Sequence, residues 1–477
     1  MKKADPNPNA NRNIMIITYA ILAIFLGMIA YFVYFLQVES EDVINNSYNA
    51  RLDSFSDRIL RGRILSSDGQ SLAETQTAED GTETRVYPFG SLFAHVVGHS
   101  TKGKTGLESQ GNFYLLNSHV NLLEQIVNEI SDQKNLGDDI VTTLDVGLQQ
   151  TAYAALGDRK GAVIALEPDT GKILAMVSKP DYDPNPASLD AAWPGLSSSE
   201  NTEGQLLNRA TQGLYPPGSV FKIVTALEAI EEYPDNYLDY MFDCSGIFYI
   251  DDYSIRCYHG TAHGSQNLAQ AFANSCNGAF ANLGLNLDRD RMYSLAGRLL
   301  FNSALPLGMS YSRSTYNMTG ESDEWEILQT SIGQGTTQVS PMHIAMITSS
   351  IANGGTLMKP YVLDRVQSAA GEEVKKFLPE AYGSLMTADE AAKLNDLMTL
   401  VVTEGTGSAL RDASYQAAGK TGSAEFETGK ETHAWFTGYA PAEDPQIAVT
   451  VIVEEGGSGG RAAAPIARQM FDQYLLR

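Results

Sequence analysis

The sequence predicts an α/β fold in which helices sandwich an antiparallel sheet, with one transmembrane helix and a small mixed domain ahead of it. Two strand patterns within residues 162–177 are matched by two more within residues 434–453, and helical patterns fill the stretch between them. Strands at both ends of a segment indicate a sheet that is closed by sequence-distant strands. An apolar run near the N-terminus predicts the membrane helix.

Composition limits the classes of function to consider. Apolar residues make up 43% of the 477 residues, enough for a sizeable core, so wholesale disorder is excluded. The 33 basic residues are outnumbered by 57 acidic ones, and this net charge of −24 disfavours nucleic acid as a partner, because such binding needs a basic surface. Three cysteines are too few for a disulfide scaffold.

The apolar run predicts a single-pass topology. Ile14 to Leu36 contains 23 mostly apolar residues, which as a helix would span roughly 35 Å, enough to cross a bilayer with some tilt. By the positive-inside rule, residues 1–13 lie in the cytoplasm and the chain after Val38 lies outside. A cleaved signal peptide is disfavoured by the length of the run and the lack of an A-x-A site. The flanking charges are Lys2, Lys3 and Arg12 before the run and Glu39, Glu41 and Asp42 after it.

The chain beyond the membrane divides into two segments. Residues 39–155 are polar, with a helical pattern over Val120–Ile130 and a helix over Leu144–Leu156 that Asp145 would cap. Residues 156–477 hold the sheet, which begins with two strands joined by turn residues. The predicted strands and the C-terminal helix of this segment are Ala162–Leu166, Ile173–Val177, Ala434–Tyr439, Ile447–Val453 and about Ala462–Leu475.

The first chemical motif is Ser219-x-x-Lys222, which follows a Pro-Pro-Gly turn and opens an apolar run. Ser219 is expected at a helix start, where backbone N–H groups and the helix dipole favour developing negative charge. A spacing of three puts both side chains on one helix face, so a desolvated lysine could act as the base that a serine nucleophile needs. Alone the motif is weak, since Ser131 and Lys134 match it too. An N-cap serine beside a solvated lysine is the alternative.

Two further motifs follow in order. Ser275-Cys276-Asn277 places a hydroxyl and an amide on the same side of a short turn, where they can relay a proton and hold a substrate carbonyl. A capping turn is the alternative. Lys420-Thr421-Gly422 is expected on a strand whose edge a substrate backbone can approach, because Gly422 has no side chain. Lys420 adds a cation that can bind a carboxylate.

The order of the three motifs is more specific than any one of them. They are 56 and 145 residues apart within one domain-sized segment, whereas single triplets recur by chance, as K-T-G does at 104–106. The ordered triple resembles the serine penicillin-recognising enzymes, and the surroundings resemble class B penicillin-binding proteins over nearly the whole chain after Val38. The stretches that carry this resemblance are Arg61–Ile64, Asp68–Gly69, Gly106–Glu108, Ser331–Gly335, Ala352–Gly355, Gly405–Gly407 and Trp435–Gly438.

The resemblance implies a fold and a reaction. It gives residues 156–477 the penicillin-binding transpeptidase fold and makes residues 39–155 a non-catalytic pedestal, or dimerisation-type, domain. The reaction is D,D-transpeptidation of peptidoglycan stem peptides, and β-lactams are its inhibitors. Ser219 would attack the D-Ala-D-Ala carbonyl, Lys222 would act as its base, and Ser275 would pass the proton to the leaving amine.

The same resemblance assigns the substrate contacts. Asn277 would hold the acyl side chain, while Lys420 and Thr421 would meet the terminal carboxylate beside Gly422. The backbone N–H groups of Ser219 and Ser423 would form the oxyanion hole. The resemblance assigns neither a metal nor another cofactor to these catalytic residues.

The three cysteines all fall between residues 244 and 276, and several interpretations stay open. Cys244 and Cys257 with His259 or His263 could form a tetrahedral zinc site, as some penicillin-binding proteins carry zinc near this position, although the spacing fits no standard zinc pattern. A Cys244–Cys257 disulfide and unligated cysteines are the alternatives. His263 also resembles part of a family turn, which would give it a purely structural role. Cys276 stands where some relatives have Asp.

These features bear on three classes of function. The favoured one is a membrane-tethered transpeptidase that works with a separate polymerase, expected to be a multi-span SEDS protein contacted through the membrane helix and the pedestal. About 120 residues between that helix and the first catalytic strand are too few for a glycosyltransferase domain, so a bifunctional enzyme is excluded.

A β-lactamase or β-lactam sensor is disfavoured because no E-x-x-L-N lies between Asn277 and Lys420. An inactive scaffold is disfavoured by the intact motifs. D,D-carboxypeptidase side activity, the acceptor amine, and a role in division, elongation or spore formation stay open.

Overall fold

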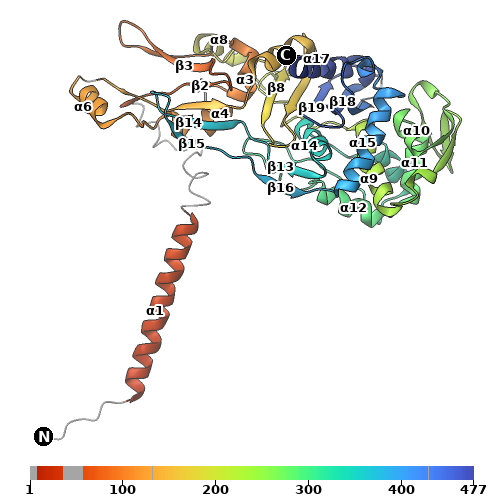
Figure 1. Ribbon diagram of the computed structural model, residues 1–477, viewed down its shortest axis with the longest axis horizontal. Coiled ribbons are helices and arrows are strands. Elements are labelled where there is room, and N and C mark those ends of the chain that lie inside the picture. The colour runs from red at the N-terminus through yellow and green to blue at the C-terminus, as the bar shows by residue number, and fades with distance from the viewer. Residues whose placement is uncertain (1–7, 36–56, 132, 428) are drawn as a thin grey trace.

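The computed structural model describes residues 8–35, 57–131, 133–427 and 429–477. The predicted membrane helix forms as α1 (Pro8–Tyr34), in which Arg12–Tyr34 is long and apolar enough to cross a membrane. Every side chain of that span is exposed, and the helix stands apart from the rest of the molecule (Figure 1). Leu36 and the predicted flanking charges other than Arg12 lie outside the described residues.

A five-stranded antiparallel sheet forms the centre of the second segment, as the sequence predicts. β19 pairs with β7 in register from Ala448–Leu166 to Val453–Gly161, so strands from the two ends of the segment close the sheet. The other pairings are also antiparallel. The strand order is β17 (Ala418–Ala424), β18 (His433–Ala440), β19 (Ile447–Val453), β7 (Gly161–Leu166) and β8 (Ile173–Lys179).

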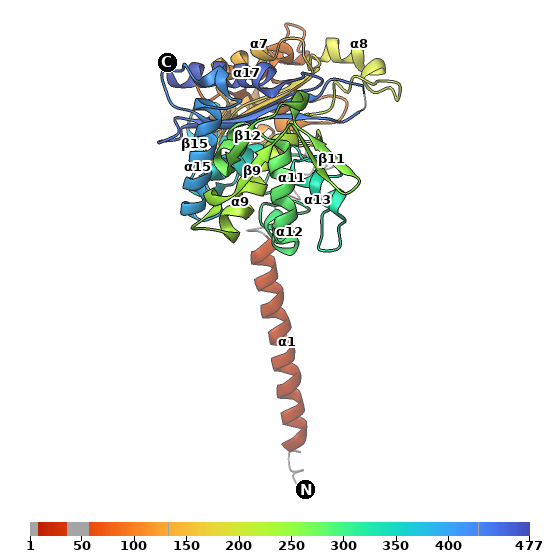
Figure 2. The ribbon, with the colours of Figure 1, turned by 90° about the vertical axis from the view of Figure 1, so that its right-hand side faces the viewer.

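Helices cover both faces of this sheet (Figure 2). α7 (Val146–Leu156) and α17 (Ala464–Leu475) pack on one face, where Val163 and Val451 join their apolar core. Alternate strand residues such as Ile164 and Ile452 point to the other face. That face is covered by α9 (Lys222–Glu232), α14 (Pro341–Ala352) and α15 (Ala388–Thr403). The predicted cap of α7 also forms, since Asp145 Oδ1 accepts a hydrogen bond from Leu148 N at 2.7 Å.

A six-stranded sheet forms the core of the preceding segment. Its order is β15 (Glu373–Lys376), β14 (Leu363–Gln367), β6 (Asp139–Thr142), β2 (Ile64–Leu65), β3 (Ser71–Thr77) and β4 (Glu83–Val86). β14 and β15 belong to the part of the chain that the sequence division places in residues 156–477, yet β14 pairs with β6. A domain boundary at residue 155 therefore does not separate the two sheets, because the β14–β15 hairpin, which follows that residue, belongs to the six-stranded sheet.

A buried ion network links two of the stretches that carry the family resemblance to this second sheet. Arg61 Nε and Arg85 Nε each donate to a carboxylate oxygen of Glu108 at 2.7 Å, and Glu108 is fully buried. Burial alone would raise the pKa of Glu108, but the two guanidinium groups outweigh it and lower that pKa to about 2. The network therefore holds a charged carboxylate beside the six-stranded sheet.

The remaining elements connect or flank the two sheets. The helical pattern predicted over Val120–Ile130 forms as α6 (Leu122–Ile130). The other helices are α3 (Ala94–Val97), α4 (Gly106–Gln110), α5 (Asn112–Leu115), α8 (Pro186–Leu196), α10 (Leu268–Ala273), α11 (Asn277–Asn286), α12 (Arg289–Arg298), α13 (Glu324–Ser331) and α16 (Gly459–Ala462). Two-stranded pairs join β1 (Ile59–Leu60) to β5 (Asn135–Leu136), β9 (Met241–Cys244) to β12 (Gly264–Asn267), β10 (Ile247–Ile250) to β11 (Tyr253–Arg256), and β13 (Thr356–Met358) to β16 (Ala381–Ser384).

Candidate active site

Ser219 lies in a short 3-10 turn, Gly218–Phe221, that leads directly into α9 at Lys222. Gly218 has a φ of +52°, and a Cβ there would lie 2.9 Å from Ser423 O on β17. Glycine therefore lets the serine turn approach the strand that carries the third motif.

Gly333 holds the same turn in place. Gly218 N donates to Gly333 O at 2.7 Å, and a Cβ on Gly333 would lie only 2.0 Å from Gly218 O. Gly333 also has a φ of +77°, which residues with side chains rarely adopt. In the sequence, the stretch around Gly333 is only one of those that carry the family resemblance. The structure shows that it packs backbone to backbone against the serine turn.

The Ser275–Asn277 turn joins α10 to α11. Ser275 has a φ of 55°, in the left-handed region, and Cys276 caps α11 by accepting a hydrogen bond from Ala279 N at 3.4 Å. Asn277 Nδ2 donates to Arg256 O at 2.9 Å and so ties the turn to β11. The capping turn expected as an alternative to a catalytic one is thus present, and it also sets the direction of both polar side chains.

Lys420, Thr421 and Gly422 lie on β17, which is the end strand of the five-stranded sheet. A Cβ on Gly422 would lie 3.1 Å from Val220 Cγ1 of the serine turn. The missing side chain therefore lets β17 lie against that turn. Because β18 pairs with one edge of β17, the other edge is left for an extended peptide to approach.

A chain of hydrogen bonds joins the three motifs. Lys222 Nζ donates to Ser275 O at 2.7 Å and to Asn277 Oδ1 at 2.8 Å. Lys420 Nζ lies 2.9 Å from Ser275 Oγ, and Lys222 Nζ lies 3.3 Å from the same oxygen. The Ser275 hydroxyl is therefore placed between two lysine amines, where it can exchange a proton with either.

Both lysines are fully buried, with 0% of their surface exposed. Burial lowers the pKa of Lys222 to about 8, and burial together with the nearby Lys222 lowers the pKa of Lys420 well below its ordinary value. Among the described residues, no carboxylate contributes to either pKa. A neutral amine is therefore available at Lys222 near physiological pH, which is the state that a general base requires.

These residues surround one cleft of about 1090 Å³. Lys222 and Lys420 are buried behind the cleft and reach it through Ser275. The structure thus brings together all the site residues that the sequence singles out. Those that line the cleft directly are Ser219, Ser275, Asn277, Thr421, Gly422 and Ser423.

Thr406 is a cleft residue to which the sequence gave no role. Its Oγ1 lies 2.5 Å from Thr421 Oγ1, and both threonines line the cleft. The neighbouring Gly405 permits this contact, because a Cβ there would lie 2.1 Å from Ala273 O. The sequence contained one signal for Thr406, namely its place in the Gly405–Gly407 stretch that carries the family resemblance. In the structure this loop orients the Thr421 hydroxyl.

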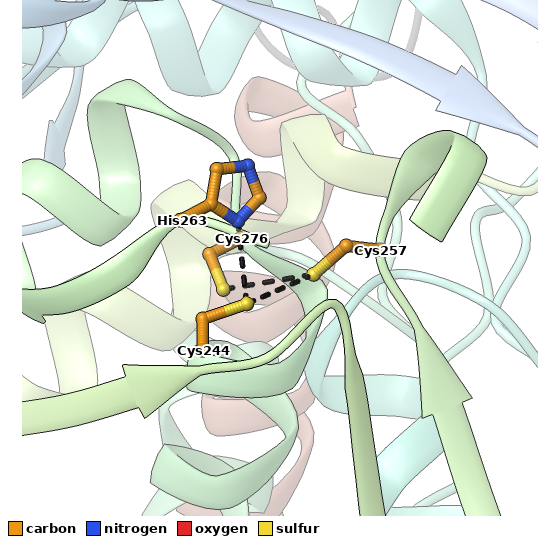
Figure 3. A group of neighbouring side chains, drawn as sticks. All are labelled: Cys244, Cys257, His263 and Cys276. Carbon is orange, nitrogen blue, oxygen red and sulfur yellow. Dashed lines mark hydrogen bonds between the residues drawn. The ribbon is translucent and has the colours of Figure 1, made fainter. Parts of the chain in front are cut away.

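The three cysteines and His263 form a compact cluster (Figure 3), and the Ser275–Asn277 turn contributes Cys276 to it. Cys257 Sγ lies 3.7 Å from both Cys244 Sγ and Cys276 Sγ, and Cys244 Sγ lies 3.4 Å from His263 Nδ1. All four potential ligand atoms lie within 4.8 Å of one another. The thiols are free, so the structure contains no Cys244–Cys257 disulfide.

The donor set of this cluster fits zinc. Three thiols and one imidazole make up one of the common closed, four-ligand zinc sites. The hydrogen bond between the Cys276 and Cys257 thiols lowers the pKa of Cys257 and raises the pKa of Cys276, so Cys257 is the one of these two residues that favours the thiolate form that metals bind. Sequence reasoning named His263 only as one of two options and missed Cys276 as a ligand. Cys276 was considered only as the middle residue of the S-x-N motif. The available signal was that it is the third and last cysteine of the chain, close in sequence to the other two.

Two family models match the chain. The penicillin binding protein transpeptidase domain matches residues 161–472, and the penicillin binding protein A dimerisation domain matches residues 61–140. Among curated relatives, the peptidoglycan D,D-transpeptidase PbpA of Mycolicibacterium smegmatis is 33% identical, covering 87% of this chain and 89% of the relative. MrdA of Acinetobacter baumannii, also a peptidoglycan D,D-transpeptidase, is 30% identical, with 82% of this chain covering 66% of that longer relative.

Solved structures agree with these matches. Penicillin-binding protein A of M. tuberculosis in its ceftriaxone acyl-enzyme complex superposes with a TM-score of 0.80 and 31% identity, covering 89% of this chain and 100% of that one. Its penicillin G acyl-enzyme complex gives a TM-score of 0.78 and 30% identity, covering 87% and 99%. The fold, the ordered motifs and these relatives agree, and the chain therefore belongs to the penicillin-binding protein transpeptidase family, as a serine-type peptidoglycan D,D-transpeptidase.

Proposed function

We propose that Ser219 is the nucleophile and Lys222 its base. Ser219 Oγ attacks the carbonyl carbon of the D-Ala-D-Ala amide while its proton passes to Lys222 Nζ. A neutral lysine has two N–H bonds and one lone pair. The two donor bonds to Ser275 O and Asn277 Oδ1 use both N–H bonds. The third position of the amine faces Ser275 Oγ at 3.3 Å, and its lone pair takes the Ser219 proton while Ser275 Oγ is bonded to Lys420 Nζ.

The leaving and accepting steps use the second and third motifs. As the amide C–N bond breaks, the proton passes through the Ser275 hydroxyl to the departing D-Ala amine. An amine of a neighbouring stem then attacks the acyl-enzyme carbonyl and forms the new amide bond as the ester bond to Ser219 Oγ breaks. The proton that the amine loses passes to Ser219 Oγ and restores the hydroxyl. The backbone N–H groups of Ser219 and Ser423 stabilise the oxyanion that forms in both the acylation step and the deacylation step.

Substrate recognition uses the end of β17. The terminal carboxylate meets Lys420 and the Thr421 hydroxyl, which Thr406 orients at 2.5 Å. Because neither buried lysine has a carboxylate partner in the part of the chain that the structure describes, the substrate itself supplies the negative charge that favours protonated Lys420. Gly422 leaves room for the peptide backbone, and Asn277 holds the acyl side chain.

The observation that carries these assignments is the placement of Ser275 between the two lysine amines on the Ser219 cleft. It is tested by labelling the purified full-length chain with fluorescent penicillin and following both uptake and release. We expect the wild type to hold the label for many minutes and Ser219→Ala to take up none. Rapid release would indicate a β-lactamase, and label retained by a folded Ser219→Ala would contradict the assignment of the nucleophile.

We also propose the topology and the partner. Residues 1–13 lie in the cytoplasm, because Lys2, Lys3 and Arg12 precede the apolar run that begins at Ile14, and the rest of the chain beyond α1 is extracytoplasmic. Residues 39–155 act as a pedestal for the transpeptidase residues 156–477, which return the β14–β15 hairpin to it. A multi-span SEDS polymerase supplies the glycan strand. The two family matches are to a transpeptidase domain and a dimerisation domain, and these support a polymerase partner because cross-linking needs glycan strands that a polymerase makes.

We propose in addition that Cys244, Cys257, His263 and Cys276 hold a structural zinc ion. Four protein ligands would leave no open position for substrate, so the ion would fix the turn that carries Cys276 and take no chemical step. We expect about one zinc per purified chain, and His263→Ala should lower both the zinc content and the unfolding midpoint. His259→Ala is the matched control, because His259 is exposed and outside the cluster. A wild-type chain without zinc that does not respond to added zinc would contradict the proposal.

A further inference from the structure

Arg256 is a cation in the catalytic cleft to which the proposed chemistry gives no role. It is the last residue of β11, and its exposed side chain lines the cleft. The residues on either side of it, Ile255 and Cys257, are only 3% and 2% exposed. Because side chains alternate along extended backbone, the burial of these two neighbours turns Arg256 to the opposite, open side. The strand therefore presents a guanidinium group to a ligand in the cleft.

Gly260 leaves the space in which this guanidinium lies. A Cβ on Gly260 would lie 2.9 Å from both Nε and Nη2 of Arg256 and 3.3 Å from its Cζ. Gly260 also has a φ of +70°, and its N–H donates to Cys257 O at 2.7 Å, which closes the turn after β11. The guanidinium is therefore packed against the backbone of this turn, which reduces the side-chain entropy that binding a ligand would cost.

Arg256 forms no ion pair in the part of the chain that the structure describes. Lys430 is the other lysine or arginine among the described residues that line the cleft, and its Nζ is paired with Glu427 Oε2 at 2.9 Å. The chain has 57 acidic residues for 33 basic ones, so carboxylate partners are in excess. A guanidinium that lacks one inside the cleft is open to a carboxylate of the ligand, which it can bind through two parallel hydrogen bonds.

The position of Arg256 indicates which end of the substrate it would meet. Asn277, which is proposed to hold the acyl side chain, donates from Nδ2 to Arg256 O at 2.9 Å. The terminal carboxylate of the stem would instead be bound at β17. Glu425 and Glu431 also line the cleft, and they belong to the connection from β17 to β18. An anionic group on the acyl portion would therefore be repelled by that connection and attracted to β11.

We propose that Arg256 binds a carboxylate on the acyl portion of the donor stem peptide, at an anion subsite separate from that of the terminal carboxylate. This inference rests on the proposed function, which places the acyl portion at Asn277, and it adds a specificity-determining contact. Two residues of a stem can carry such a carboxylate, namely the one that precedes D-Ala-D-Ala and the one before it. Both offer the same pair of oxygens to the guanidinium.

The test uses the full-length chain and penicillins that differ only in the acyl side chain. In each pair the side chain ends in a carboxylate or in the matching carboxamide, and successive pairs are longer by a methylene group. Competition with fluorescent penicillin gives the second-order rate of acylation. We expect the carboxylate to react about three- to tenfold faster than its carboxamide in at least one pair, and added salt should reduce this ratio. The length at which the ratio peaks distinguishes the two stem residues.

Variants then assign the preference to the guanidinium. Arg256→Gln should abolish the difference between carboxylate and carboxamide, whereas Arg256→Lys should keep part of it, because lysine retains the charge without the planar fork. Lys430→Gln is the matched control, since Lys430 lines the same cleft but is already paired, and its ratio should equal that of the wild type. A wild type with no preference in any pair, or a preference that persists in Arg256→Gln, would overturn the inference.

Fluorescent-penicillin labelling separates this subsite from the proposed function. A folded wild type that takes up no label would refute the proposed function, whereas a wild type that labels without any carboxylate preference would refute only the role of Arg256. Gly260→Ala gives a second reading that keeps the arginine, because the added Cβ would displace the guanidinium. Its carboxylate-to-carboxamide ratio should fall below that of the wild type, and an unchanged ratio would contradict the proposed subsite.

Discussion

Lys222 shows how burial alone can prepare a side chain for catalysis. Its amine is fully buried, and this burial lowers its pKa to about 8. If the neutral amine is the base, the rate constant for penicillin acylation should rise with pH as the amine loses its proton. We expect about a tenfold gain per pH unit well below 8 and a plateau above it. The measurement is the second-order acylation rate between pH 6 and 9.

The control for this pH profile is Lys222→Met, which keeps an apolar stem of similar length but has no titrating amine. Its acylation should fall about 10²–10⁴-fold, as loss of a general base does, and the remaining rate should lack the rise near pH 8. A wild-type rate that stays flat across the range, with the fold intact by circular dichroism, would refute Lys222 as the base.

The serine turn depends on a neighbouring element that contributes no side chain to it. A Cβ on Gly333 would lie 2.0 Å from Gly218 O, so Gly333→Ala should push the Ser219 turn away from its place beside β17. We expect a loss of about 1–3 kcal/mol in stability from the positive φ and the clash, together with at least about tenfold slower acylation. Thermal unfolding and penicillin labelling measure the two effects.

Gly354→Ala separates backbone strain from displacement of the turn. Gly354 also has a positive φ, +59°, but nothing lies within 4 Å of the Cβ that alanine would add. It should cost about 1–2 kcal/mol and leave acylation unchanged. If both substitutions slowed acylation equally, the close contact between Gly333 and the Ser219 turn would not be what positions Ser219.

At the scale of the whole molecule, the two sheets are linked by the β14–β15 hairpin. Val366 of β14 pairs with Ile140 of β6, and both residues are fully buried. A fragment of residues 57–155 would lack β14 and expose this edge, so we expect it to aggregate or remain unfolded. Fusing residues 361–378 to the fragment should restore a monomeric fold. Circular dichroism and size-exclusion chromatography distinguish the results, and cooperative folding of the shorter fragment would refute the dependence.

Much of the fold follows from local pattern. Apolar runs with turn residues between them identified the strand pair at Ala162–Leu166 and Ile173–Val177, because strand and turn preferences act over a few residues. The N-cap at Asp145 and the apolar length of α1 are equally local. Pairings between distant segments could not be predicted in this way. β14 and β15 join the sheet that contains β6, and no residue pattern in either segment indicates that they pair.

The sequence by itself determined the membrane helix, the antiparallel sheet and the side chains of the three motifs, because each is recorded in residue types at short spacing. Only the tertiary structure decided how they act together. It buried Lys222 and Lys420 on either side of Ser275, brought Thr406 to Thr421, and joined Cys276 to the other cysteines. It also set the Arg256 guanidinium against Gly260 in the cleft. Burial, pKa and ligand geometry are properties of neighbours in space, which residue order does not record.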